Sequence, residues 1–144
     1  MEQKDRLVQL LKKHAKIERE HVKQLGKIEK DTGNAAAKLL LLEMKLDSKK
    51  HAGIISGILK TVRGVPSSKT LWQYELDSYV DPVVVRRAVE NHIKMESDVL
   101  AHVEEEIKQT KDEGIKLLLQ HIAEDEKKHH KILEEIVKNS YKIS

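Results

Sequence analysis

The chain has 144 residues, of which 39% are hydrophobic, 35% are charged and 3% are aromatic, and its net charge is +3. This length suits one domain. The abundance of Leu, Lys, Glu and Ala with few aromatic residues argues against a β-sandwich or barrel, and the absence of Cys excludes disulfides, zinc–thiolate sites and iron–sulfur clusters. Basic and acidic residues are spread along the chain rather than gathered in one block, so we expect no nucleic-acid partner.

The N-terminus and the longest Leu run indicate neither export nor membrane insertion. The opening residues, Met-Glu-Gln-Lys-Asp, contain no apolar stretch of the kind found in signal peptides. The run from Leu39 to Leu42 is far too short to span a bilayer. We therefore expect a cytoplasmic protein with no membrane partner.

Turn and cap residues divide the chain into four helical segments. The first ends at Asp31-Thr32-Gly33-Asn34, and the second ends before Gly64-Val65-Pro66. The third opens at Asp81-Pro82, an N-cap followed by Pro at the first helical position. A short break near residues 110–112 precedes the fourth. The predicted helices cover about residues 2–30, 35–62, 82–109 and 113–139.

The spacing of these segments predicts an all-α four-helix bundle with one long crossover. The two short breaks make two antiparallel hairpins, about residues 2–62 and 82–140. The linker between them, residues 63–81, can extend to roughly 60 Å and run back along a whole helix. One domain over residues 1–144 is therefore expected.

The two hairpins repeat each other without a gap when 78 is added to the residue number. His14 and Glu18 correspond to His92 and Glu96. The run Lys38-Leu-Leu-Leu corresponds to another Lys-Leu-Leu-Leu run at Lys116, and other matches follow in the second half of each hairpin. A match of this length predicts two equivalent hairpins related by a pseudo-twofold axis.

Polar residues interrupt the apolar stripe of every predicted helix near its middle. These residues, with the Asp beside two of the stripes, are His14, Glu18 and His21; Asp47, Ser48 and His51; His92 and Glu96; and Asp125, Glu126 and His129. Counting from the turns places one residue of each helix at the same level, close to mid-bundle. These residues are Glu18, Ser48, Glu96 and Glu126. Because buried carboxylates without partners are costly, protons, His–Glu pairs or metal ions must neutralise them.

The metal alternative matches a known pattern of ligands. Di-iron and di-manganese carboxylate bundles take one Glu from each of two helices and Glu-x-x-His from each of the other two. Glu126 and His129 form a complete pair of this kind, and their one-turn spacing puts both side chains on one face. Ser48 stands where the Glu of the second pair would be. The ligand positions that are filled are Glu18, His51, Glu96, Glu126 and His129.

The segment from Ala123 to His129, Ala-Glu-Asp-Glu-Lys-Lys-His, is similar to the fourth-helix signature of the rubrerythrin-type branch of the ferritin-like superfamily. The resemblance extends over both hairpins and implies a ferritin-like four-helix bundle of two repeated hairpins joined by a long crossover. It implies that the five filled positions are metal ligands. Asp47 and Asp125 match the Asp residues that orient a ligand His on the opposite helix. The implied cofactor is Fe, as two ions, or Mn, and Zn can occupy the same ligands adventitiously.

Several residues depart from the family pattern. Ser48 removes a carboxylate that normally bridges or chelates the metals, so one of the two sites should be weakened. His21 makes a Glu18-x-x-His21 pair and is a candidate replacement ligand. His14 and His92, one turn before the two Glu residues, are further candidate ligands or hydrogen-bond partners of those carboxylates. Without Cys, the chain cannot carry the rubredoxin domain of rubrerythrins proper.

Two classes of function follow, and the sequence leaves both open. The first is a metal-binding protein whose di-iron or di-manganese type site reacts with peroxide or dioxygen or handles iron; as an enzyme it would be an oxidase or peroxidase that needs an external electron donor. The second is a non-enzymatic structural or interaction bundle with a degraded site, or with a mononuclear site at Glu96, Glu126 and His129. The charged exposed faces predict a monomer or homodimer.

Overall fold

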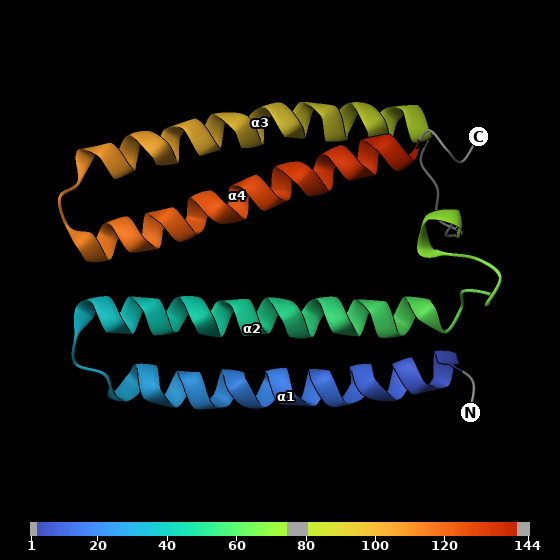
Figure 1. Cartoon of the computed structure of the whole chain (residues 1–144), viewed down its shortest axis with the longest axis horizontal. Helices are drawn as coiled ribbons and strands as arrows, with labels where there is room; N and C mark the ends of the chain where they lie inside the picture. The colour runs from blue at the N-terminus through green and yellow to red at the C-terminus, as the bar shows by residue number, and fades with distance from the viewer. Residues whose placement is uncertain (1–2, 75–80, 141–144) are drawn as a thin grey trace. The chain divides into compact units, whose positions relative to one another are not determined.

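The computed structural model describes residues 3–74 and 81–140, and among these residues it contains four α-helices, one short 3₁₀ helix and no strand (Figure 1). The predicted all-α fold is confirmed. No helix bound differs from the predicted one by more than one residue. Residues 75–80 of the expected crossover lie outside the described residues. The helices are α1 (Gln3–Asp31), α2 (Ala35–Val62), α3 (Pro82–Gln109) and α4 (Glu113–Ser140), with η1 at Leu71–Gln73.

The helices form two antiparallel hairpins, as the short breaks predicted. Helix α1 packs against α2, which makes hairpin 1, and α3 packs against α4, which makes hairpin 2. The chain divides into two compact units at the same place, residues 1–74 and residues 75–144. The single domain over residues 1–144 stays a prediction. Among the described residues, no helix is long and apolar enough to cross a membrane.

Polar N-caps fix where three of the helices begin. The Asn34 side chain accepts a hydrogen bond from the backbone N–H of Ala37 at 3.0 Å. Asp81 accepts from the N–H of Val83 at 2.9 Å. Asp112 accepts from the N–H groups of Gly114 and Ile115 at 2.8 and 3.1 Å. Each cap satisfies N–H groups that the helix itself leaves without a partner.

Asn34 and Asp112 occupy the same position of the 78-residue repeat, so their removal should have matching effects. We expect Asn34→Ala and Asp112→Ala each to lower the free energy of unfolding by about 1 kcal/mol, because each loses its cap and keeps the helix. Urea unfolding followed by circular dichroism measures this loss. A change in only one variant would show that the two turns are not equivalent.

The seam of each hairpin, meaning the residues through which its two helices pack, follows a regular three-and-four spacing. The covered positions of α3 are those of α1 plus 78, and the covered positions of α4 are those of α2 plus 78. In the middle of the chain's four helices the seam positions are Val8, Leu11, Ala15, Glu18, Val22 and Leu25 of α1; Ser48, Ala52, Ile55 and Leu59 of α2; Arg86, Val89, Ile93, Glu96, Leu100 and Val103 of α3; and Glu126, His130, Leu133 and Val137 of α4.

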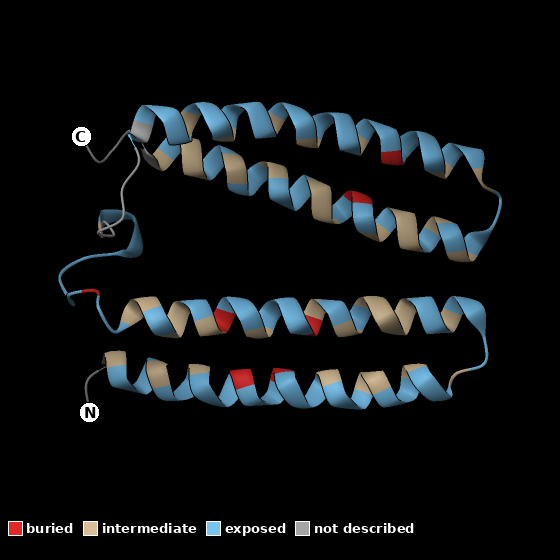
Figure 2. Cartoon of the chain, turned by 180° about the vertical axis from the view of Figure 1, so that it is seen from behind, coloured by how far each residue is buried: buried red, intermediate tan, exposed pale blue. Residues whose placement is uncertain are grey.

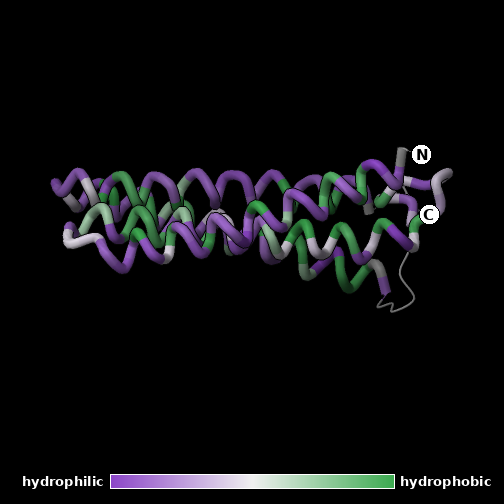
Figure 3. The backbone as a smooth tube through the Cα atoms, turned by 90° about the horizontal axis from the view of Figure 1, so that it is seen from below, coloured by the Kyte–Doolittle hydropathy of each residue, from purple (hydrophilic) through white to green (hydrophobic). Residues whose placement is uncertain are grey.

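Each hairpin also has a stripe of apolar residues that stays exposed, one position N-terminal to the seam. Because α-helices are right-handed and the two helices are antiparallel, these stripes lie on the same side of the hairpin in both helices. We call this side the open face. Figure 2 shows how little of each hairpin is buried, and Figure 3 shows hydrophobic segments recurring along the helices. Large exposed apolar residues of the open faces include Leu7, Ile17, Met44 and Ile54 in hairpin 1 and Val85, Met95, Val99, Ile122 and Ile132 in hairpin 2.

Candidate metal centre

The predicted ligands divide between the seam and the open face. Glu18, Glu96 and Glu126 lie on the seams, together with Ser48. The open faces carry the imidazoles and the two Asp side chains. These open-face residues are His14, His21, Asp47 and His51 in hairpin 1 and His92, Asp125 and His129 in hairpin 2. Carboxylates and imidazoles are therefore neighbours within each hairpin, at the edge where the seam meets the open face.

In hairpin 2, Glu96, Glu126 and His129 form a compact group of three metal-type donors. One ligand atom from each lies within 4.8 Å of the other two. Helix α3 supplies Glu96, and one turn of α4 supplies both Glu126 and His129, with 3.8 Å between His129 Nδ1 and Glu126 Oε1. The antiparallel pairing of α3 and α4 thus brings together residues 30 positions apart in the sequence.

His92 fixes one end of this group. Its Nε2 lies 3.0 Å from Glu96 Oε1, within hydrogen-bond distance, and the two residues are one turn apart on α3. The carboxylates of Glu96 and Glu126 are only 15% and 16% exposed. Among the described residues, Glu96 Oε2 and Glu126 Oε2 are buried with no hydrogen-bond partner.

These two oxygens test whether a metal ion fits the site. A buried acceptor without a donor costs about 1–3 kcal/mol, and more if it is charged. No cationic Lys or Arg side chain of the described residues pairs with either carboxylate. Two carboxylates and one imidazole are ligands suited to Fe, Mn or Zn. The donor set, its burial and its unmet hydrogen-bonding capacity therefore fit a divalent metal ion.

Hairpin 1 has a different balance of donors around Glu18, which is 8% exposed. Glu18 Oε2 lies 3.2 Å from His51 Nδ1, and Glu18 Oε1 lies 3.6 Å from His14 Nε2. Ser48, 9% exposed, takes the place that Glu126 has in hairpin 2. Hairpin 1 therefore offers one carboxylate between two imidazoles, where hairpin 2 offers two carboxylates with an imidazole beside each.

The remaining predicted residues lie nearby with other partners. His21 is exposed on α1, one turn beyond Glu18. Asp47 Oδ1 lies 3.6 Å from Lys50 Nζ on its own helix. Asp125 Oδ2 lies 3.6 Å from His121 Nε2, also on its own helix. The expectation that the two Asp residues orient a His on the opposite helix stays a prediction.

His121 is the residue near the candidate centre to which the sequence analysis gave no role. It is half-buried one turn before Asp125. The signal that could have identified it is the four-residue spacing to Asp125, which places both side chains on the same face of α4. That spacing also occurs between His130 and Glu134, whose side chains pair at 2.8 Å and do not belong to the donor group, so it has little specificity.

Comparison with protein families gives a match to the Rubrerythrin family over residues 23–137. Comparisons with curated proteins and with solved structures give no match. The matched range begins within α1 and includes α2, α3 and most of α4, and with them Ser48, His51 and the donor group of hairpin 2. The resemblance predicted from the fourth helix is therefore confirmed. With two helical hairpins and a family match over about four fifths of its length, the chain belongs to the rubrerythrin family of the ferritin-like superfamily.

Proposed function

We propose that the chain is a metal-binding protein of the dinuclear carboxylate type, in which Glu96, Glu126 and His129 hold the first ion. The observation that carries this proposal is the pair of buried carboxylate oxygens that have no hydrogen-bond partner in residues 3–74 and 81–140, next to an imidazole nitrogen. Protonation of Glu96 and Glu126 would also reduce their negative charge, but it would not explain why two carboxylates and the His129 imidazole lie together. Iron or manganese is the proposed metal, with zinc as an adventitious occupant.

The second ion of the proposed pair would take Glu18 and His51. For both ions to share one centre, the two hairpins must pair through their open faces into a single four-helix domain, which is part of the proposal. Support comes from the large apolar residues exposed on those faces, since exposed apolar side chains gathered on one side of a protein mark a contact surface. His14, His21 and His92 are the proposed additional or replacement ligands, and Ser48 makes the second position the weaker one.

The proposed reaction is the reduction of peroxide or dioxygen, or the oxidation of iron. When bound, iron or manganese would supply the electron-transfer chemistry. The residues of this chain have simpler tasks. His92 holds the Glu96 carboxylate at 3.0 Å, and the half-buried seam excludes most water from both Glu side chains. Electrons for repeated turnover must come from an external donor.

A structural or interaction bundle with a degraded site is the second candidate function. Ser48 favours it, because a hydroxyl is a poor replacement for a chelating carboxylate. The contacts of Glu18 favour it too, since both of its oxygens already lie within 3.6 Å of an imidazole nitrogen. In that function the His–Glu pairs would neutralise the core without metal.

Metal content decides between the two functions. After loading with Fe(II) or Mn(II) and desalting, we expect the protein to retain between one and two equivalents. Glu126→Ala should lose about 100-fold or more in metal affinity, since even residues that only support ligands cost 10–100-fold. The matched control is Glu124→Ala, on the same helix turn but 67% exposed, which should bind like the unaltered chain. Retention near zero, with unchanged helical circular dichroism, would refute the metal-binding function.

A further inference from the structure

The two hairpins carry opposite net charge. Residues 1–74 contain 16 Lys and Arg against 8 Asp and Glu, a net charge of +8, whereas residues 75–144 contain 11 against 16, a net charge of −5. The net charge of +3 is therefore the sum of two halves of opposite sign. The expectation of no nucleic-acid partner rested on the even spread of charge along the chain, and the charges of the two halves taken separately are not even.

The cations of hairpin 1 gather on the side opposite its open face. The positions one residue C-terminal to the seam define this side, which we call the basic face. From Lys12 onward it contains no Asp or Glu. All of its cations are exposed, and none forms an ion pair with a carboxylate among the described residues. They are Lys12, Lys16, Arg19, Lys23 and Lys30 of α1 and Lys38, Lys49, Lys60 and Arg63 of α2.

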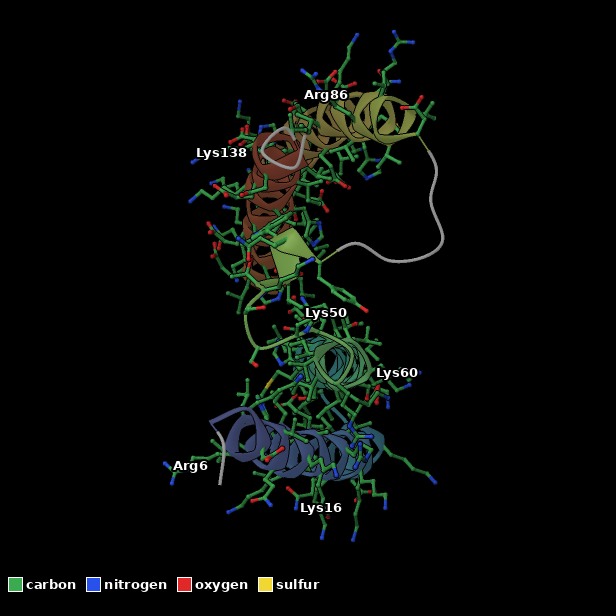
Figure 4. The ribbon with its side chains drawn as sticks, turned by 90° about the vertical axis from the view of Figure 1, so that its right-hand side faces the viewer. Arg6, Lys16, Lys50, Lys60, Arg86 and Lys138 are labelled. Atoms are coloured by element: carbon green, nitrogen blue, oxygen red, sulfur yellow. The ribbon has the colours of Figure 1, made fainter. Side chains whose placement is uncertain are left out.

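The basic face is long and straight. The row on α1 from Lys12 to Lys30 covers 18 residues, which is about 27 Å along the helix. The helix α2 runs antiparallel beside it, and an interaxial distance of about 8–10 Å is typical of packed helices. Lys16 of α1 and Lys60 of α2 extend away from the helix pair into solvent (Figure 4). The cations therefore form an extended double row rather than a pocket.

The equivalent side of hairpin 2 shows that helix packing does not require these cations. Adding 78 to Lys12, Arg19 and Lys23 gives Glu90, Ser97 and Ala101. Further acidic residues on the same side of hairpin 2 are Glu104, Glu124 and Glu134. The repeat thus keeps the hairpin architecture with charged residues of both signs on this side of hairpin 2 and, from Lys12 onward, charged residues of positive sign alone on this side of hairpin 1.

We propose that the basic face of hairpin 1 binds the phosphate backbone of double-stranded nucleic acid without sequence preference. A duplex carries one charge per about 1.7 Å of its axis with both strands counted, so a 27 Å length carries roughly 16 phosphates, and the basic face can contact those on the side turned toward it. The face has no aromatic side chain and, apart from Leu42 and Leu46, little apolar surface, whereas protein interfaces depend on aromatic and Arg anchors in desolvated pockets. Cations without base-reading neighbours give phosphate contacts alone.

The test measures binding of the full-length protein to a fluorescent DNA duplex of about 30 base pairs, starting at about 50 mM KCl. With five to nine phosphate contacts, the slope of log affinity against log salt should lie between about −4 and −8. An RNA duplex of the same length, measured in parallel, should bind within a few fold, because the proposed contacts are to the shared phosphates. If neither the DNA duplex nor the RNA duplex binds at about 50 mM KCl, the proposal is refuted.

The repeat supplies a matched pair of variants. The triple variant Lys16→Glu, Lys30→Glu and Lys49→Glu should weaken duplex binding at least tenfold and make the salt slope shallower by about 3. The control variant Lys94→Glu, Lys108→Glu and Lys127→Glu changes the net charge equally at the equivalent positions of hairpin 2, and should stay within about threefold of the unaltered chain. Both variants should keep their helical circular dichroism.

Two results would overturn the proposal. Equal losses from both triple variants would mean that net charge rather than the basic face controls binding. Tighter binding to vesicles containing about 20% phosphatidylserine than to either duplex would identify an anionic membrane as the partner. The metal-binding function does not enter these measurements, because they use the protein without added metal.

Discussion

Replacing Ser48 with Glu is expected to destabilise the metal-free protein and to strengthen metal binding, two effects of opposite sign from one substitution. Ser48 is 9% exposed and occupies the position that Glu126 has in the repeat. A second carboxylate near the buried Glu18 would add a buried negative charge without a cation, at a cost of about 2–3 kcal/mol. For a chain of this size, the melting temperature should fall by roughly 4–10 °C.

With metal present, the same carboxylate should become a ligand. We expect Ser48→Glu to bind a second equivalent at least tenfold more tightly than the unaltered chain, a gain of about 1.4 kcal/mol or more per ion. Metal titration followed by calorimetry measures it. The control is Ser56→Glu, at a half-buried position on the basic face of α2 where the repeat itself has the exposed Glu134. A destabilised Ser48→Glu protein whose metal stoichiometry and affinity do not change would contradict the proposed second site.

Replacing Glu126 with Leu should have the reverse pattern. Glu126 has a buried oxygen with no hydrogen-bond partner among the described residues, so an apolar side chain of similar size should stabilise the metal-free protein by about 1–3 kcal/mol. The melting temperature without metal should rise by roughly 2–10 °C. The stabilisation that metal gives the unaltered chain, about 2.7 kcal/mol at a metal concentration 100 times the dissociation constant, should disappear.

Thermal unfolding with and without Mn(II) measures both parts of this prediction. Glu124→Leu is the control, because its side chain is exposed on the same turn and should change neither the metal-free stability nor the response to metal appreciably. If Glu126→Leu destabilises the metal-free protein, the Glu126 carboxylate contributes to stability without metal, which would contradict the prediction.

The sequence was sufficient to predict the helices and their pairing, because the signals are local. Asn34, Asp81 with Pro82, and the turn before Glu113 define where three helices begin, and each acts within a few residues of itself. The approach of Glu96 to Glu126 and His129 also followed from counting along two straight helices from their shared turn. In regular helices, position along the chain translates directly into height along the hairpin.

Side-chain direction and partner choice needed the structure. The sequence left open whether His14 and His92 are metal ligands or hydrogen-bond partners of the Glu residues one turn away. In the structure, His14 Nε2 lies 3.6 Å from Glu18 Oε1 and His92 Nε2 lies 3.0 Å from Glu96 Oε1. The pairing of Asp125 with His121 was missed, since a four-residue spacing is common on charged helices. The basic face was missed as well, because the cations of hairpin 1 can be assigned to one side of the hairpin only when the seam positions are known.

The pairing of helices that are neighbours in the sequence has a consequence for synthesis in the cell. Contacts within hairpin 1 are local, and helical proteins with local contacts fold in microseconds to milliseconds. A ribosome adding about 5–20 residues per second needs roughly 4 to 14 s to make residues 75–144. If hairpin 2 covers the open face as proposed, the nascent hairpin 1 waits seconds for that cover, and its net charge of +8 would keep copies on neighbouring ribosomes apart during that interval.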